Sequence, residues 1–162
     1  MNQLANALGT KFVESKEQLR IRTFDLNGVT FKIKVPLTVE TDLMFEKNKI
    51  VDEAKAKQFY DEMANEFITY KDKYASDPEI VYKDDDIIVK NISLKETARN
   101  KALTQNRITS LFQLIVPEDP NFDMSTITYA DIDENFPFNV QIELIEEIAK
   151  VISPSYTQNK GK

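Results

Sequence analysis

The stretch LRIRTFDLNGVTFKIKVP, residues 19–36, decides the fold class. Two runs rich in β-branched and aromatic residues flank the dipeptide Asn27-Gly28. Asn-Gly suits the positive φ angles of a type I′ turn, whose twist matches that of the flanking strands. The stretch therefore predicts a β-hairpin. Because an isolated two-stranded ribbon is only marginally stable in water, we expect a helix to cover its apolar face.

The turn also predicts the register of the hairpin. Pairing outward from it places Leu26 opposite Val29, Phe24 opposite Phe31 and Arg22 opposite Ile33. The apolar face then consists of Phe24, Leu26, Val29, Phe31, Ile33 and Val35. Ile21 falls on the wrong face in this register, so we predict either a β-bulge near Arg22 or Thr23, or a ribbon that ends near Arg22.

Helix-forming sequence follows the hairpin. It predicts one helix from residue 39 to about 47 and a longer helix from about 52 to 74, because the stretch EKNKIVDE at 46–53 breaks the pattern. The longer helix carries a stripe of Phe59, Met63, Phe67, Tyr70 and Tyr74. A stripe of aromatic residues and methionine at helical spacing is typical of core packing.

The middle of the chain combines a second β-prone region with a long helix. EIVYKDDDIIVKNI at 79–92 predicts a second short hairpin around Asp84-Asp85-Asp86. Ser93 and Glu96 have the spacing of a capping box, which predicts the start of a helix that continues to Val116, just before a proline. The expected buried stripe of this helix is Leu94, Ala98, Ala102, Ile108, Leu111, Phe112 and Ile115.

The C-terminal third predicts a loop and two helices. The loop at 117–127 carries Phe122 and Met124, and Thr128 then has the pattern of an N-cap for a short helix that stops at Phe136-Pro137. The last helix should run from about 138 to 152. Its expected inward residues are Phe138, Ile142, Ile145, Ile148, Ala149 and Ile152.

The predicted fold class is α+β and mostly helical, with the N-terminal β-hairpin packed on a bundle of about four helices and a second short hairpin. Residues 1–18 are predicted to form an N-terminal arm, as a short helix or a mobile segment, since Gly9 interrupts its helical spacing. Residues 19–152 are predicted as a single α+β domain, and residues 153–162 as a disordered tail.

Composition excludes several classes of function. The 162 residues include no cysteine and no histidine, which removes disulfides, thiolate metal sites and every Ser-His-Asp or Cys-His constellation. The formal net charge of −6 argues against a nucleic-acid or membrane partner. No apolar run approaches the length of a membrane span, and no signal-peptide pattern begins the sequence, so we expect a cytoplasmic protein.

The acidic clusters are weak candidates for cation binding. At most two of the adjacent carboxylates Asp84, Asp85 and Asp86 would converge on a strand, so a solvated turn is the favoured interpretation. The segment Asp131–Asn135 begins like a calcium loop, but Phe136 replaces the required glycine and Ile142 the bidentate glutamate. With three glycines in the chain, a dinucleotide fingerprint is also excluded. We therefore expect no cofactor, no metal and no enzymatic activity.

Two segments carry a resemblance to a known family. FDLNGVTFKIKVPLTVET at 24–41 reads as a strand, a tight Asn-Gly turn, a second strand and a Leu-Thr step into a helix. ITYADIDENFPFNVQIELIEEIAKVIS at 127–153 reads as an acidic short helix, an aromatic-Pro step and a closing amphipathic helix. This layout resembles the tail assembly chaperones of long-tailed bacteriophages, with EIVYKDDDIIVKN at 79–91 as a departure from the family pattern.

The resemblance implies a non-enzymatic protein of the host-cell cytoplasm that is absent from the finished virion. Its partner would be the tape-measure protein, which it keeps soluble while the tail tube polymerises. The family often makes a longer frameshifted form of the same protein, which is a second expected partner, and the closing Lys160-Gly161-Lys162 is compatible with a slippery coding run. Covering the apolar stripe of a long helical client would prevent its aggregation.

The apolar residues least explained by the predicted core are the expected contacts with this partner. They are Leu4, Leu8, Phe12 and Phe122. Two alternative functions remain open from the sequence. One is a structural particle component, such as a head–tail connector or tail-terminator subunit, which would assemble symmetrically. The other is a small carboxylate-dependent and metal-dependent hydrolase.

Overall fold

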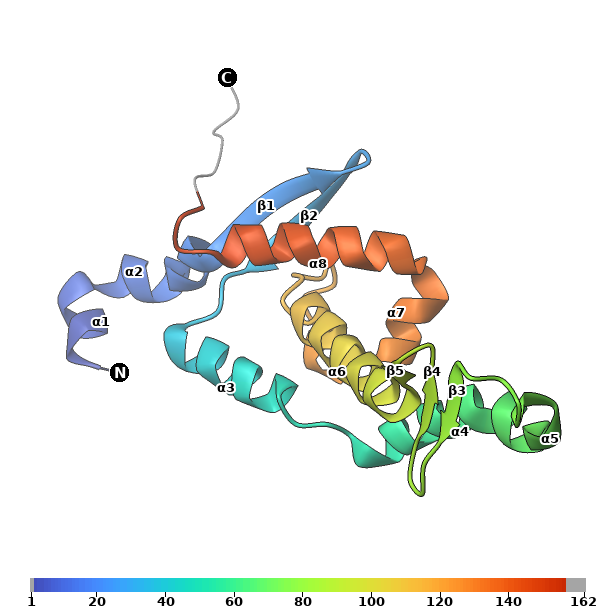
Figure 1. Ribbon diagram of the computed structural model, residues 1–162. Coiled ribbons are helices and arrows are strands. Elements are labelled where there is room, and N and C mark those ends of the chain that lie inside the picture. Colours follow the sequence, from blue (N-terminus) through green and yellow to red (C-terminus); the bar gives the residue numbers. More distant parts are fainter. Residues whose placement is uncertain (1, 157–162) are drawn as a thin grey trace. The chain divides into compact units, whose positions relative to one another are not determined.

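The computed structural model describes residues 2–156 of the chain (Figure 1). Contacts divide the chain into two compact units, Met1–Leu43 with Ile108–Lys162, and Met44–Arg107. The prediction of one domain over 19–152 concerns folding as a single unit and stays a prediction. Most of the predicted tail, residues 157–162, lies outside the described residues.

The first unit begins with three short helical segments. They are α1 (Gln3–Leu8), α2 (Thr10–Ser15) and the 3-10 helix η1 (Lys16–Arg20). Gly9 separates α1 from α2 with φ 86°, a left-handed conformation that suits glycine. The Asn2 side chain accepts a hydrogen bond from the N–H of Ala5 and so caps α1. Of the two alternatives for the arm, the structure therefore has the helical one.

The hairpin has the predicted register. Strands β1 (Ile21–Leu26) and β2 (Val29–Lys34) pair antiparallel, with Phe24 opposite Phe31 and their rings stacked 5.4 Å apart. Asn27 and Gly28 both have positive φ, as a type I′ turn requires. Figure 1 shows the ribbon beside helix α8 (Phe138–Ile152), which packs on both strands and covers it as expected.

The predicted β-bulge is wrong, and so is the alternative that the ribbon ends near Arg22. Pairing continues without interruption through Arg22 opposite Ile33 to Ile21 opposite Lys34. The Arg22 guanidinium donates hydrogen bonds to the carbonyls of Val151 and Ser153 at the C-terminal end of α8. A charged residue is tolerated on the inner face because it has these partners, so nothing forces the register to shift.

The outer edge of β2 is also paired. The N–H of Lys34 donates to the carbonyl of Leu114, and the N–H of Val116 donates to the carbonyl of Lys32. The chain can reach this edge because helix α6 (Leu94–Phe112) ends four residues before the predicted Val116. Backbone groups at the edge are thereby satisfied without a third full strand.

Two further helical segments complete the first unit, η2 (Met124–Thr126) and α7 (Tyr129–Asn135). Thr128 and Asp131 form a capping box at the start of α7, which confirms the predicted N-cap. The predicted inward face of α8 is partly wrong, since Phe138 is exposed. The buried residues of α8 are Gln141, Leu144, Ile145, Ile148 and Val151.

Gln141 explains the shifted face of α8. Its side-chain amide donates to the Asp133 carboxylate at 3.1 Å and to the Phe136 carbonyl at 2.8 Å. Its side-chain oxygen accepts from the Tyr129 hydroxyl at 2.9 Å. Because all its polar atoms are paired, a glutamine takes a fully buried position that a sequence pattern assigns to an apolar residue.

The second unit is built on two long helices and a small sheet. Helix α3 (Thr38–Asn48) leads into it, α4 (Glu53–Thr69) and α5 (Lys71–Tyr74) follow, and most of α6 closes it. The predicted second hairpin is confirmed as β3 (Ile80–Tyr82) and β4 (Ile87–Val89), and β5 (Ile92–Ser93) adds a third strand.

The core of the second unit lies between α4 and α6. It consists of Ala56, Phe59, Ala98 and Ala102, with Val51, Tyr60 and Met63 packed against it. Phe59 and Met63 of the predicted stripe thus contribute to the core. Tyr70 is exposed, because α4 ends at Thr69 and the helical phase is not carried through to residue 70.

Candidate functional site

The clearest candidate for a binding surface is the exposed apolar face of α1. Leu4 is 65% exposed and Leu8 is 52% exposed. Residues four apart lie on the same side of a helix, so the two leucines form one face, while Ala5 is buried on the other. Two large apolar side chains are therefore presented together to solvent.

The other two expected contact residues are placed differently. Phe12 lies on α2 and is only half-buried, while Phe122 is exposed in the loop between α6 and η2. Phe122 comes from a segment far from α1 in the sequence, and only Leu4 and Leu8 share one helical face. Of the four predicted residues, these two form a continuous candidate surface.

A second exposed apolar face lies on α3 and the turn that follows it, and the sequence analysis did not single it out. Val39, Leu43 and Ile50 are exposed there, and no residue of α3 is buried. Apolar residues occur on several sides of this helix, so its sequence shows little amphipathic contrast. The spacing of the three exposed residues, four and then seven positions, was the signal that could have identified the face.

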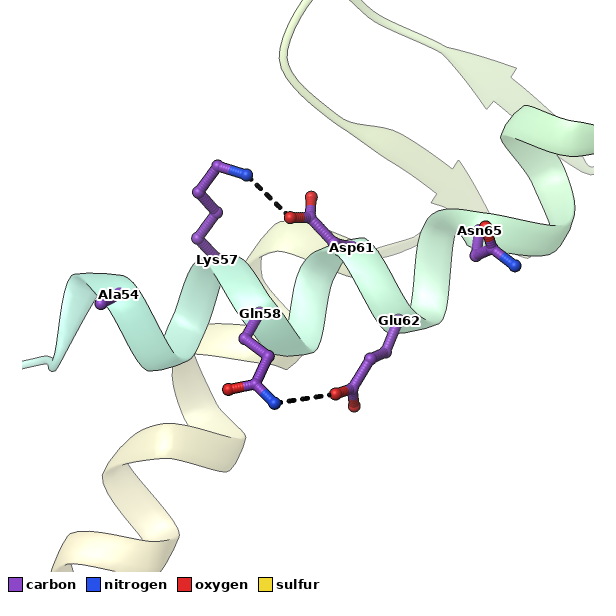
Figure 2. A pocket seen from close by; sticks show the side chains of 6 residues that line it. All are labelled: Ala54, Lys57, Gln58, Asp61, Glu62 and Asn65. Carbon is purple, nitrogen blue, oxygen red and sulfur yellow. Dashed lines mark hydrogen bonds and ion pairs between the residues drawn. The ribbon is translucent and has the colours of Figure 1, made fainter.

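Helix α4 borders two hollows in the second unit. The larger, about 620 Å³, is open and lies along the outer face of α4 (Figure 2). Figure 2 shows Lys57 paired with Asp61 at 2.7 Å and Gln58 bonded to Glu62 at 3.1 Å. These pairs join residues of one helix at neighbouring turns, so they form a solvated helix face.

The smaller hollow, about 250 Å³, is more enclosed and charged. Ala56 and Tyr60 of α4 line it together with two ion pairs, Lys95 with Asp85 and Arg99 with Glu53, each at 2.8 Å. Each of these four charged groups thus has a partner of opposite sign.

The Tyr60 hydroxyl in this hollow is not poised to act as a base. Burial raises the pKa of Tyr60, and the carboxylates of Asp86, Asp85 and Asp61 raise it further. The phenol therefore stays protonated at neutral pH. With its neighbouring cations already paired, the hollow has the character of a compensated surface ion-pair cluster.

The Asp84–Asp86 turn has a structural role that the sequence analysis did not foresee. Asp86 accepts hydrogen bonds from the Ser93 hydroxyl and from the N–H groups of Ile87 and Lys95. Ser93 in turn accepts from the N–H of Glu96. Asp86 and Ser93 together cap the N-terminus of α6, so this carboxylate is not simply solvated.

The pKa of Asp86 reflects this role. Burial alone would raise the pKa of its carboxyl, but the hydrogen bonds from Ser93, Lys95 and Ile87 outweigh burial and hold the pKa below its usual value. Because the folded-state pKa is lowered, the carboxylate stabilises the fold above the unfolded-state pKa of about 3.9. That contribution is lost as the pH falls through the lower folded-state value.

Replacing Asp86 by alanine is expected to lower the free energy of unfolding by about 1–2 kcal/mol at neutral pH, because α6 loses its cap. Urea denaturation followed by circular dichroism measures the change. The difference from the original protein should shrink as the pH is lowered below about 4, where the carboxylate becomes protonated. The exposed neighbour Asp84, changed to alanine, is the matched control and should change the stability by less than about 0.5 kcal/mol. Equal effects at the two positions would refute the capping role.

Two searches bear on other classes of site. Across residues 2–156, no group of three His, Cys, Asp or Glu side chains is arranged to hold a metal ion. Within the same described part, no helix combines the length and apolar character needed to cross a membrane.

Comparison of the chain with protein-family models, with curated proteins and with solved structures finds no match.

Proposed function

We propose that the protein is a phage tail assembly chaperone that binds the tape-measure protein and keeps it soluble during assembly of the tail tube. The observation that supports this most is the exposure of Leu4 and Leu8 on one face of α1. An apolar helical client aggregates through its own exposed stripe, and a chaperone must offer apolar side chains that cover it.

The composition of α1 suits this role. Its sequence, QLANAL, contains no charged residue, so covering this helix buries no ionised group. Each leucine that becomes fully buried contributes about 1.5–3 kcal/mol. The two leucines together supply enough apolar contact for a reversible complex that is released when the tail tube forms.

The acidic charge of the chain complements the apolar face. A net charge of −6 keeps the protein and a bound client soluble through mutual repulsion between complexes. The exposed acidic helix faces, such as the outer face of α4 with Asp61 and Glu62, remain available for hydration while α1 is covered. This combination of an uncharged apolar helix and an acidic body is what a solubilising partner needs.

Co-expression with the tape-measure protein of the same phage tests the proposal. The original protein should raise the soluble fraction of the client, and the double variant Leu4→Ser with Leu8→Ser should lose this effect. Its affinity for the client should fall at least tenfold, because two buried leucines are replaced. Helicity measured by circular dichroism should be unchanged, since both side chains are exposed.

Ile68→Ser is the matched control. Ile68 is similarly exposed on a helix, but it lies on α4 in the second unit. This variant should solubilise the client as well as the original protein does. If the α1 variant and the control behave alike, the α1 face is not the client site. If the original protein never changes the client's solubility, the chaperone proposal fails.

A further inference from the structure

Helix α3 presents an apolar stripe on its outward side. Val39, Leu43 and Ile50, at the helix and the turn after it, are 61%, 67% and 68% exposed. On the opposite side of the helix, Thr41, Met44 and Asn48 are half-buried. The spacing of four and seven positions places the stripe where the a and d residues of a coiled-coil helix lie, with Glu46 completing it.

The charges beside this stripe are segregated along the helix. Glu40 and Asp42 lie in its N-terminal half, while Lys47 and Lys49 lie at its C-terminal end. In the heptad frame, Asp42 and Lys49 flank one side of the stripe, and Glu40 and Lys47 flank the other. Each side therefore carries one acidic residue near one end and one basic residue near the other.

We propose that this face binds the same face of a second copy of the protein, with the two α3 helices antiparallel about a two-fold axis. In this arrangement Val39 packs against Ile50 of the second copy, and Leu43 packs against the aliphatic part of Glu46. Antiparallel helices bring like flanking positions together. Asp42 then meets Lys49 of the second copy, and Glu40 meets Lys47.

The charges on the page favour a second copy over another occupant. A basic client helix would be attracted by Glu40 and Asp42 but repelled by Lys47 and Lys49, whereas a second copy matches both halves. The side chains of Asp42 and Lys47 have no hydrogen bond or ion pair within residues 2–156, so they are free to pair across the interface.

The other two charged residues already have exposed partners. Lys49 pairs with Glu46 at 2.9 Å, and Glu40 pairs with Arg20 and accepts from the N–H of Leu37. Exposed ion pairs contribute little to stability, so sharing or exchanging them across an interface is not prohibitive. The Lys49 ammonium can contact Glu46 of its own chain and Asp42 of the second copy at once, because an ammonium has three donors.

Glu46 sets the orientation. A parallel pair would place Glu46 directly against Glu46 of the second copy within the stripe, where two like charges would repel each other. The antiparallel pair separates them and sets each against Leu43. The geometry is therefore specific in direction, and the interface is isologous.

The interface is small. An 11-residue helix spans about 16 Å, and three apolar side chains from each copy bury less area than a stable dimer requires. We expect a reversible dimer with a dissociation constant on the order of 100 µM. This self-association goes beyond the proposed chaperone function and uses residues different from the α1 face.

Sedimentation velocity of the full chain, without client, tests the proposal. Over concentrations from about 10 µM to about 1 mM, the original protein should shift from monomer to dimer. Asp42→Lys should weaken association about tenfold, and Lys49→Asp should do the same, because each places like charges together at two symmetric positions. Circular dichroism establishes that each variant is folded.

The decisive sample is an equimolar mixture of the two variants. In the mixed dimer, the lysine introduced at position 42 of one chain meets the aspartate introduced at position 49 of the other, and the unchanged Lys49 meets the unchanged Asp42. The mixture should therefore dimerise as well as the original protein, although each variant alone associates more weakly. A parallel pair would bring residue 42 to residue 47 and would not be rescued in this way.

Leu43→Glu provides an independent variant in the stripe itself and should abolish the dimer. The proposal is overturned if the original protein stays monomeric throughout the concentration range. It is also overturned if it dimerises equally well with Asp42→Lys, or if the mixture of charge variants fails to recover association. Since no client is present, none of these results depends on the chaperone function.

Discussion

Replacing Gln141 by leucine is expected to lower the free energy of unfolding by about 2–4 kcal/mol. Gln141 is fully buried on α8 and bonds the Tyr129 hydroxyl, the Asp133 carboxylate and the Phe136 carbonyl. Leucine has a similar volume, so the main loss is the pairing of these three groups. Chemical denaturation followed by far-ultraviolet circular dichroism measures the effect.

A double-mutant cycle with Tyr129→Phe separates this network from general packing. Tyr129→Phe removes one hydrogen bond and should cost about 1 kcal/mol by itself. In the Gln141→Leu background it should cost much less, because the hydroxyl has already lost its acceptor. Additive losses, or a Gln141→Leu protein as stable as the original, would contradict the role assigned to Gln141.

Replacing Arg22 by leucine should lower the free energy of unfolding by about 1.5–3 kcal/mol. The guanidinium donates to the carbonyls of Val151 and Ser153, at 2.5 and 3.3 Å, where α8 ends and its dipole favours a cation. It also lies 5.5 Å from the centre of the Tyr156 ring. The variant keeps an apolar side chain opposite Ile33 but leaves the end of α8 without its donor.

Arg22→Lys is the informative control. Lysine keeps the positive charge beside the helix terminus but not the planar fork of donors, so it should recover only part of the lost stability. Thermal unfolding ranks the three proteins as original, lysine variant and leucine variant, in falling order. A leucine variant at least as stable as the original would show that Ile21 and Arg22 could exchange faces without loss, as the bulged ribbon required.

Local chemistry made much of the fold predictable. The Asn27-Gly28 turn allows one backbone geometry, and that geometry sets the register of every pair in the hairpin. Helix boundaries followed from short-range signals as well. Thr128 caps α7 as predicted, and the break between α3 and α4 lies within the stretch that interrupts the helical pattern.

Features that depend on long-range partners were not predictable in the same way. Arg22 stays on the inner face of the ribbon because its partners are the carbonyls of Val151 and Ser153, far along the chain. Gln141 is buried because groups on α7 satisfy it, and this rotates the inward face of α8 away from Phe138. A sequence pattern records hydrophobicity, and it does not record which polar atoms will find a partner.

The candidate surfaces show the same division. Leu4 and Leu8 were singled out because the predicted core left them unexplained, and the structure places both on one exposed face. Asp86 was expected to be solvated, yet it caps a helix that begins several residues later. The α3 face was missed, because residues such as Val39 and Leu43 are indistinguishable from core residues until their exposure is known.

The central claim is that the protein covers an apolar helical client with the face formed by Leu4 and Leu8. The most direct measurement is a binding titration of the purified protein against overlapping peptides that span the tape-measure protein. We predict saturable binding confined to peptides with an apolar helical stripe, and loss of that binding in the Leu4→Ser, Leu8→Ser variant. Absence of binding to every peptide, or binding that the variant retains in full, would contradict the claim.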